Sequence, residues 1–145
     1  MTVQRIVSVQ QNRTVAHITP DAPVGEVLQS PAFADTGALV VSSDGRTVEG
    51  IISERDIVRG LGRIGPDLLS KSVRDLMTTK VITCALDDRA AGIMAIMVSR
   101  HIRHLPVVTD GKLVGMVSIQ DLLKLRLEEV QSEADAMRKY ITGSE

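Results

Sequence analysis

The sequence holds very few of the residues that covalent frameworks and aromatic binding surfaces require. Its 145 residues include one cysteine, one phenylalanine, one tyrosine and no tryptophan. With Cys84 alone a disulfide framework is excluded, and a reducing, cytoplasmic location is expected. So few rings also exclude a platform of aromatic side chains that stacks on nucleic-acid bases. The core must therefore be built from aliphatic side chains.

Excess charge and long apolar runs are lacking as well. Lys and Arg number 17 and Asp and Glu 18, so the formal net charge is −1. This balance argues against binding nucleic acid or a membrane surface through a broad basic face. No apolar run approaches the roughly 20 residues of a membrane-spanning helix. The first twelve residues lack the apolar stretch and small-residue cleavage site of a signal peptide. We therefore expect a folded protein whose partners are neither nucleic acid nor membrane.

The chain consists of two copies of one pattern. Residues 37–41 (GALVV) align with 103–107 (RHLPV) at an offset of 66, and an Asp-Gly pair follows each at the same offset. After one extra residue in the first copy, 50–56 (GIISERD) aligns with 115–121 (GMVSIQD) at an offset of 65. Each copy is predicted to be an α/β (α+β) unit of order β-α-β-β-α. Because a unit of this size is marginal alone, the two are expected to pack with pseudo-two-fold symmetry.

The alignment also predicts element and domain boundaries. The expected strands are residues 15–18, 39–42 and 48–52 in the first copy, and 81–83, 105–108 and 113–117 in the second. Helical spacing is clear from Ile93 to Met97, whereas Pro31 is expected to kink or end the matching helix. The copies are predicted at residues 2–62 and 72–127, with a linker at 63–71 and a helical tail at 128–145.

The tail carries an apolar stripe that is typical of paired helices. Apolar residues recur at alternating steps of four and three, at Leu123, Leu127, Val130, Ala134, Met137 and Ile141. In one interpretation the stripe packs on its own module. In the other it forms a contact between two copies in a homodimer, which is favoured because the stripe continues beyond the end of the repeat.

A Gly-x-Gly-x-x-Gly motif occurs at Gly60, Gly62 and Gly65. This motif binds a dinucleotide only where it leaves a strand and opens a helix. Here it follows the helix that starts near Ser53 and runs into Pro66. We therefore interpret it as the end of a helix and the start of the linker.

Two Ser-x-x-Asp motifs, Ser53 to Asp56 and Ser118 to Asp121, each follow a predicted strand. A serine N-cap with an acid three residues later is a capping box. The same position has a second use, because a helix N-terminus attracts phosphate and a nearby carboxylate accepts hydrogen bonds from ribose hydroxyls. Arg55 lies between the first pair and is suited to a phosphate. Capping and ligand binding both remain open from the residues alone.

Two other chemistries are rejected. His101 and His104 lack the further ligands, at suitable spacing, that a metal site requires. A hydrolase triad could be composed from the residue types of Ser118, His104 and Asp121. The sequence has no nucleophile elbow or oxyanion loop to accompany it, so this interpretation is rejected. No metal, no catalytic cofactor and no enzymatic activity are therefore expected.

These blocks carry a resemblance to a known family. The Ser-Glu-Arg-Asp block after Gly-Ile-Ile, the Arg-His-Leu-Pro-Val-Val block, and the Ser-Ile-Gln-Asp block after Gly-Met-Val resemble a tandem cystathionine-β-synthase (CBS) domain pair, or Bateman module. The likeness covers roughly residues 2 to 127 and is greatest to small stand-alone bacterial pairs. Some of these are labelled as related to inosine-monophosphate dehydrogenase, whose catalytic barrel does not fit beside two CBS units here.

The resemblance implies a regulatory module with two nucleotide sites between the repeats. The first would be built on Ser53, Arg55 and Asp56, with Thr78, Val81 and Thr83 from the second copy. The second would be built on Ser118, Gln120 and Asp121, with Asn12 and His17 from the first. Arg103 and His104 match positions that face phosphate in the second site, and Pro106 is predicted with them. Their counterparts in the first copy, Gly37 and Ala38, are uncharged.

The ligands implied by the resemblance are adenine nucleotides. AMP is the preferred ligand, with NAD(H), ADP or ATP as further candidates, and the implied role is to sense cellular energy or redox state. A regulated protein partner and a homodimer are also implied. The alternative is a structural dimerisation or adaptor module that controls an enzyme or transporter without binding a ligand.

Overall fold

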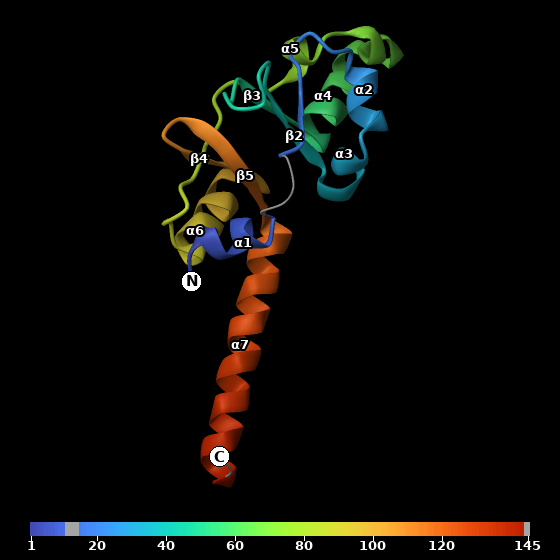
Figure 1. The fold of residues 1–145 in the computed structure, drawn as a ribbon. Coiled ribbons are helices and arrows are strands. Elements are labelled where there is room, and N and C mark those ends of the chain that lie inside the picture. Colours follow the sequence, from blue (N-terminus) through green and yellow to red (C-terminus); the bar gives the residue numbers. More distant parts are fainter. Residues whose placement is uncertain (11–14, 144–145) are drawn as a thin grey trace.

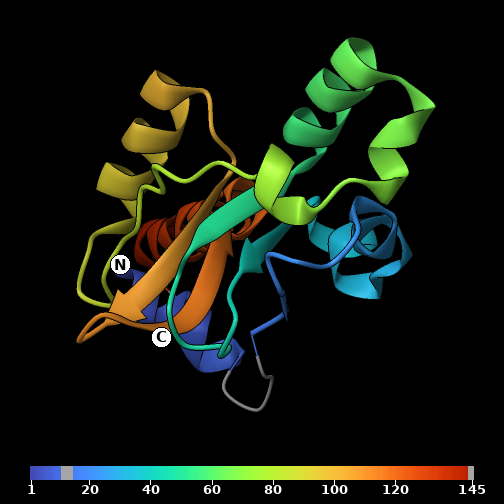
Figure 2. The same ribbon diagram turned by 90° about the horizontal axis from the view of Figure 1, so that it is seen from above.

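The computed structural model describes residues 1–10 and 15–143, which form two small sheets surrounded by helices. In chain order the elements are α1 (Val3–Val9), β1 (His17–Ile18), α2 (Val24–Gln29), α3 (Pro31–Thr36), β2 (Ala38–Val41), β3 (Gly50–Ser53), α4 (Glu54–Ile64), the 3-10 helix η1 (Pro66–Ser70), α5 (Val73–Leu76), α6 (Ala90–Arg100), β4 (His104–Thr109), β5 (Lys112–Ser118) and α7 (Ile119–Thr142). The two sheets lie side by side at the centre, with helices on their outer sides (Figures 1 and 2). The predicted mixed α/β class is confirmed. Asn12, a predicted site residue, lies outside the described residues.

Each repeat contains the predicted antiparallel hairpin. In the first, β2 pairs with β3 and β1 adds a parallel strand beside β2. In the second, β4 pairs with β5 from His104 opposite Ser118 to Thr109 opposite Lys112. The turn residues Asp110 and Gly111 both have positive φ, 51° and 76°. Positive φ at both central residues is typical of the two-residue turn that an Asp-Gly pair favours. The hairpin predicted from this pair is therefore confirmed.

The predicted strand at 81–83 is wrong. The second sheet contains only β4 and β5, and the nearest pairing is an isolated parallel bridge between Cys84 and Val107. The Cys84 N–H donates to the Pro106 carbonyl at 3.0 Å, and the Val108 N–H donates to the Cys84 carbonyl at 2.9 Å. The β4–β5 register shifts between Val107 and Val108. The extra residue of that shift, Val114, belongs to β5, so it leaves β4 regular beside residues 81–83. In the described residues the extended segment gains a single bridge, because strand propensity alone does not supply a paired neighbour.

Proline has the predicted effect in the first repeat. Helix α2 ends at Gln29, and α3 begins with Pro31 in its first turn. Ser30 caps α3, because its hydroxyl accepts a hydrogen bond from the Phe33 N–H at 3.4 Å. Proline suits a first turn because that position needs no N–H donor. The matching segment of the second repeat has no proline and forms the continuous helix α6.

Two hydrophobic cores exist, and each takes residues from the opening segment of the other repeat. Val3 and Ile6 of α1 are buried in the second core, beside Leu105 of β4. Val73 and Leu76 of α5 are buried in the first core. The short helix that opens each copy therefore packs on the other copy. Neither core is complete without both repeats.

The backbone contacts of the two opening segments are equivalent. In each, the first residue of the helix donates its N–H to a carbonyl of the other repeat. The next residue of the helix donates to the carbonyl that lies two positions before that acceptor. The hydrogen bonds are Val3 to Asp88 (2.9 Å), Gln4 to Leu86 (2.9 Å), Val73 to Ala22 (2.8 Å) and Arg74 to Pro20 (2.9 Å). The acceptors are 66 residues apart, which is the offset of the sequence repeat. The exchange therefore follows the pseudo-two-fold relation between the copies.

Helix α7 is much longer than the packing of its own repeat requires. Its first turns bury Leu122 and Leu125 in the second core. The remainder extends away from the molecule and carries the C-terminus to its far end (Figure 1). The stripe residues Leu127, Met137 and Ile141 are 60–74 % exposed. The interpretation that the stripe packs on its own module is therefore wrong.

The glycine-rich motif lies at the end of α4, as predicted. Gly60 is buried, and a β-carbon there would lie 2.7 Å from Leu76 Cδ2 and 2.8 Å from Leu68 Cδ1. Leu68 belongs to η1, so the predicted linker contributes to the first core. A β-carbon at Gly62 would meet nothing within 4 Å, and Gly65 ends the helix with φ of 84°. The spacing therefore reflects packing and helix termination.

Gly60 and Gly62 form a matched pair for a stability test. Gly60→Ala should lower the free energy of unfolding by about 1–3 kcal/mol, because the added methyl overlaps two packed leucines. Gly62→Ala should raise it by up to about 1 kcal/mol, because alanine favours an exposed helical position. Urea unfolding of both variants measures the two changes. Equal effects would contradict the packing role of Gly60.

Candidate functional site

The N-termini of α4 and α7 form two equivalent capping boxes. The Asp56 N–H donates to Ser53 Oγ at 3.4 Å, and the Ser53 N–H donates to Asp56 Oδ2 at 2.9 Å. In the second repeat the Asp121 N–H donates to Ser118 Oγ at 3.1 Å, and the Ser118 N–H donates to Asp121 Oδ2 at 2.9 Å. The capping interpretation is confirmed in both copies. In both copies the capping hydrogen bond goes to Oδ2 of the aspartate. Any further interaction of these carboxylates therefore depends on Oδ1.

The second oxygen of Asp56 is occupied by a residue from the other repeat. Thr78 Oγ1 donates to Asp56 Oδ1 at 3.0 Å. Thr78 is held there by its backbone, because its N–H donates to the Ile51 carbonyl at 2.9 Å and its carbonyl accepts from the Ile51 N–H at 3.0 Å. The structure thus brings Ser53, Asp56 and Thr78 together. Both oxygens of Asp56 accept hydrogen bonds from the protein.

The described residues engage Asp121 through one oxygen. Within residues 1–10 and 15–143, Oδ2 accepts from Ser118 and no hydrogen bond reaches Oδ1. The side chain is half-buried at the start of α7. The repeat offset of 66 relates Thr78 to Asn12, which is not among the described residues. The described part of this site therefore presents a half-buried carboxylate oxygen at a helix N-terminus, where an incoming hydroxyl group can donate to it.

The starts of β2 and β4 lie beside these helix ends. The Glu54 N–H donates to the Gly37 carbonyl at 3.0 Å, and the Ile119 N–H donates to the Arg103 carbonyl at 2.9 Å. The predicted equivalence of Gly37 and Arg103 therefore holds in space. A β-carbon on Gly37, where φ is 80°, would lie 3.0 Å from Glu54 Oε1. The Glu54 carboxylate thus lies over Gly37, a role that sequence reasoning missed because its counterpart Ile119 is apolar.

His104 joins the two repeats. Its Nε2 is hydrogen bonded to the Thr36 carbonyl, so Nε2 carries the proton and Nδ1 does not when the ring is neutral. Burial lowers the pKa of His104 below its ordinary 6.5. Arg103 acts in the same direction, whereas the Thr36 carbonyl and the carboxylates of Glu54 and Asp121 act against it. The imidazole is therefore neutral and lies within the field of one cation and two carboxylates.

Arg55 also spans the repeats. Its Nη1 donates to the His101 carbonyl at 2.7 Å, at the end of α6. His101 itself takes a left-handed conformation with φ of 54°. A third contact between the repeats joins the Leu113 N–H to the Arg46 carbonyl at 2.7 Å. Arg55 is thus used for an inter-repeat contact at the edge of the first site, where phosphate binding was predicted.

The remaining predicted residues make no side-chain hydrogen bond with the two carboxylates in the part of the chain that the structure describes. The exposed ring of His17 lies over the first hairpin loop, where a β-carbon on Gly45 would be 3.0 Å from Cε1. Pro106 is buried in β4. Of the others, Val81 is half-buried, Ala38 is buried in β2, and Thr83 and Gln120 are exposed. The hydrogen bonds of the described residues join none of these side chains to Asp56 or Asp121.

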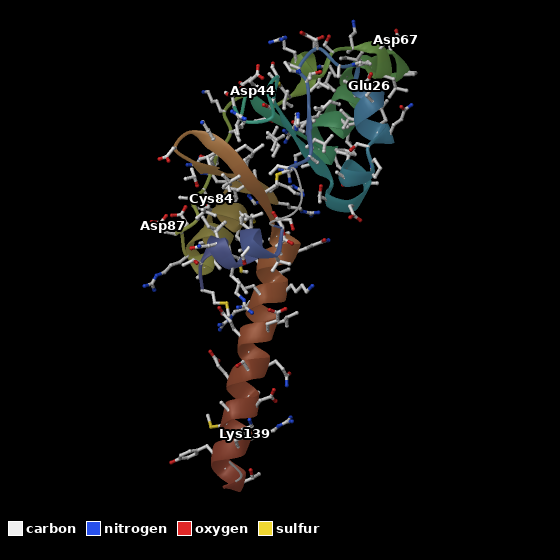
Figure 3. The ribbon with its side chains drawn as sticks, viewed as in Figure 1. Glu26, Asp44, Asp67, Cys84, Asp87 and Lys139 are labelled. Carbon is white, nitrogen blue, oxygen red and sulfur yellow. The ribbon has the colours of Figure 1, made fainter. Side chains whose placement is uncertain are left out.

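The described residues contain neither a metal-binding cluster nor a membrane-spanning helix. No group of three or more His, Cys, Asp or Glu side chains there is arranged to hold a metal ion. Among those residues, no helix combines the length and apolar character needed to cross a membrane. Cys84 lies inside the second repeat (Figure 3), where burial, aided by Asp88, raises the pKa of its thiol to about 12. A thiol of that kind is unreactive at neutral pH.

The fold and paired helix ends define a tandem-repeat module rather than two separate domains, and comparison with known proteins identifies its family. The CBS domain family matches twice, at residues 6–63 and 73–128, and the chain belongs to that family. It is 35 % identical over 129 residues to the mitochondrial CBS domain-containing protein CBSX3 of Arabidopsis thaliana. That match covers 86 % of this chain and 63 % of the plant protein, so the chain spans less than two thirds of that relative.

Solved structures agree with this assignment. The CBS-domain protein ATU1752 of Agrobacterium tumefaciens has a TM-score of 0.80 and 32 % identity, over 87 % of this chain and 99 % of that one. The CBS domain pair of protein MJ0100, solved with 5′-methylthioadenosine and S-adenosyl-L-methionine, has a TM-score of 0.75 at 22 % identity. That match covers 89 % of this chain and 98 % of that one, and shows a shared fold.

The position of His104 predicts a pH dependence of stability. A histidine whose pKa is lowered by folding binds fewer protons in the native state than in the unfolded state. The free energy of unfolding should therefore fall as the pH decreases below about 6.5, by at most about 1.4 kcal/mol per pH unit. Urea titrations between pH 8 and pH 5.5 measure it. His104→Gln, which keeps a donor for Thr36 but does not titrate, should reduce the slope, and an unchanged slope would contradict the assignment.

Proposed function

We propose that this chain is a regulatory module that binds an adenosine-containing ligand, AMP by preference, at the site built on Asp121. The observation that carries the proposal is the Asp121 carboxylate, whose Oδ1 accepts no hydrogen bond from the described residues. A carboxylate at a helix N-terminus is suited to ribose, because it accepts hydrogen bonds from the hydroxyl groups while the helix end favours a nearby phosphate. Family membership supports this use of the site, since a pair of the same fold holds adenosine compounds.

The charges around Asp121 support a phosphorylated ligand. Arg103 is exposed at the start of β4 and lies close enough to His104 to influence the pKa of its ring. The Arg103 guanidinium is the charge we assign to a phosphate. His104 contributes less directly, because its Nε2–H is already given to Thr36 and its neutral Nδ1 has no proton to donate. AMP is preferred because its single phosphate matches Arg103, the cation that we assign to it.

The site built on Asp56 is the weaker candidate in this proposal. Both of its carboxylate oxygens accept hydrogen bonds from Ser53 and Thr78, so a ribose would have to displace the threonine hydroxyl. Arg55 gives one N–H to the His101 carbonyl, which ties its guanidinium to the end of α6 and leaves its other N–H groups for a phosphate. Among the described residues, only the Asp56 carboxylate is hydrogen bonded through both oxygens, and we expect the Asp121 site to fill first. NAD(H), ADP and ATP remain ligands to be compared with AMP.

A structural dimerisation or adaptor module without a ligand is the alternative function. The exposed apolar stripe on α7 favours it, because that surface is independent of the helix N-termini. The two functions differ in one measurement. A sensing module is stabilised by its ligand through RT ln(1 + [L]/Kd), about 2.7 kcal/mol at a hundredfold excess over Kd. If none of AMP, ADP, ATP, NADH and S-adenosylmethionine raises the melting temperature of the protein, the sensing proposal is overturned. The adaptor function would then be the one supported.

Asp121→Asn separates capping from ribose binding. The asparagine carbonyl can accept the Ser118 N–H as Oδ2 does now, while its NH2 group replaces the acceptor Oδ1 with a donor. We expect an apo melting temperature close to that of the wild type and AMP binding weakened about ten- to a hundredfold, the value of a lost charge-assisted bond. Calorimetric titration with AMP and thermal melts of the apo forms provide both readings.

Asp56→Asn is the matched control for this experiment. It makes the same chemical change at the equivalent capping box, where the carboxylate is already occupied by Thr78. The control should weaken AMP binding much less than Asp121→Asn. Equal binding by Asp121→Asn and the wild type would refute the assigned role of Asp121. A larger loss of AMP affinity in Asp56→Asn than in Asp121→Asn would assign the ligand to the first site instead.

A further inference from the structure

The outer part of α7 is not buried against the other described residues. From Val130 to Ile141 every residue is exposed, and Lys139 lies on the segment that projects from the molecule (Figure 3). Just before this segment, Glu129 forms an ion pair with the N-terminal amine at 3.8 Å. Isolated helices of fewer than about 12–15 residues are marginal in water. A segment of this kind requires a partner for its apolar face.

The stripe on this helix turns away from the body. Leu122 and Leu125 face the second core, and at 3.6 residues per turn the centre of the stripe from Leu123 to Ile141 lies roughly 130° around α7 from them. The stripe therefore does not compete with the contacts that hold α7 to its own repeat. It is also distinct from the apolar groove between α6 and α7, which is lined by Met94, Leu122 and their neighbours. A second helix can reach the stripe without disturbing the fold.

We propose that residues 123–141 pair with the same residues of a second copy in a parallel, in-register, two-stranded coiled coil. The steps of four and three place the stripe at the two core positions of a heptad repeat, conventionally a and d. Positions a are Leu127, Ala134 and Ile141, and positions d are Leu123, Val130 and Met137. Each residue would then face its own counterpart across the two-fold axis.

Charge at the flanking positions selects the parallel arrangement. Glu133 occupies a g position and Arg138 the next e position, which are the positions that meet between chains in a parallel coil. The pair would form twice, once on each side of the dimer. Among the described residues neither side chain makes a hydrogen bond or ion pair within its own chain. Both are therefore available to a partner.

An antiparallel coil that preserves the same core layers would be repulsive. In that register e positions face e positions, so Lys124 would lie opposite Arg138 of the second copy. Likewise g positions face g positions, so Glu133 would lie opposite its own counterpart. Like charges placed opposite each other cost free energy, whereas the parallel arrangement pairs opposite charges. A second copy in the parallel orientation is the occupant that the sequence of the helix fits.

The first test is the mass of the full chain in solution. Light scattering should give a dimer for the wild type at micromolar concentration and a monomer for Val130→Asp combined with Met137→Asp, because two charges would enter the core of the coil. Ser132→Asp combined with Ala136→Asp adds the same charge to other faces of α7 and should remain dimeric. A monomeric wild type, or a dimer unaffected by the core substitutions, would overturn the proposal.

The second test uses the charge pair. Glu133→Arg should weaken the dimer about tenfold, since two attractive pairs become repulsive. The helix itself should not suffer, because the substitution removes a like charge four residues from Glu129. Glu133→Arg combined with Arg138→Glu should restore the dimer. Dissociation constants from sedimentation measure all three, with circular dichroism to check helicity, and no weakening or no rescue would exclude the parallel pairing.

The third test reports the orientation directly. Met137→Cys places a thiol at a d position, which in a parallel coil lies against its own counterpart and should form an interchain disulfide on mild oxidation. In the antiparallel register the two thiols would be about 15 Å apart along the axis. Asp135→Cys, on the outer face, is the matched control and should not cross-link. Cys84 does not interfere because it is buried. A dimer without a disulfide at position 137 would overturn the parallel arrangement.

Discussion

The exchange of opening segments between the two repeats is the contact on which the rest of the structure depends. Val3 and Ile6 complete the second core, and Val73 and Leu76 complete the first. A repeat of about 60 residues buries little apolar surface and is marginal alone, and here each would also lack a helix. The free energy of folding is therefore shared, and the two copies fold as one unit. The equivalent backbone hydrogen bonds at both exchanges fix the relative orientation of the repeats.

The same exchange builds the site around Asp56, the weaker of the two candidate ligand sites. After α5 has packed on the first repeat, the chain continues beside β3, where Thr78 pairs with Ile51 and presents its hydroxyl to Asp56. A residue from the second copy thus completes a capping box that belongs to the first. The contact of His104 with Thr36 and that of Arg55 with His101 add further inter-repeat bonds nearby. A ligand bound here would touch both repeats, so its binding would stabilise their arrangement.

Features set by local physical chemistry could be predicted from the sequence. Asp110 and Gly111 suit a tight turn, Pro31 starts a helix, and Ser118 caps one, whatever surrounds them. Pairings over long distances could not. The apolar character of Val3 predicts burial but does not say which core receives it. Val81 to Thr83 have strand propensity, yet no regular ladder forms beside them. Strand propensity measures fit to a neighbour, and the neighbour is set by the whole fold.

Helix α7 joins the two functional surfaces of the protein in one continuous element. It begins at the capping box of Ser118 and Asp121, packs through Leu122 and Leu125, and ends in the exposed stripe. If two copies pair in parallel along that stripe, the N-termini of both α7 helices lie at the same end of the coil. Asp121 precedes Leu123 by two residues and so occupies an outer (b) position of the same heptad, which points both carboxylates away from the two-fold axis. A parallel coil would therefore hold both modules at one end of the dimer and keep the two Asp121 sites on its outer sides, open to solvent. An antiparallel pair would instead place the two modules at opposite ends of the coil.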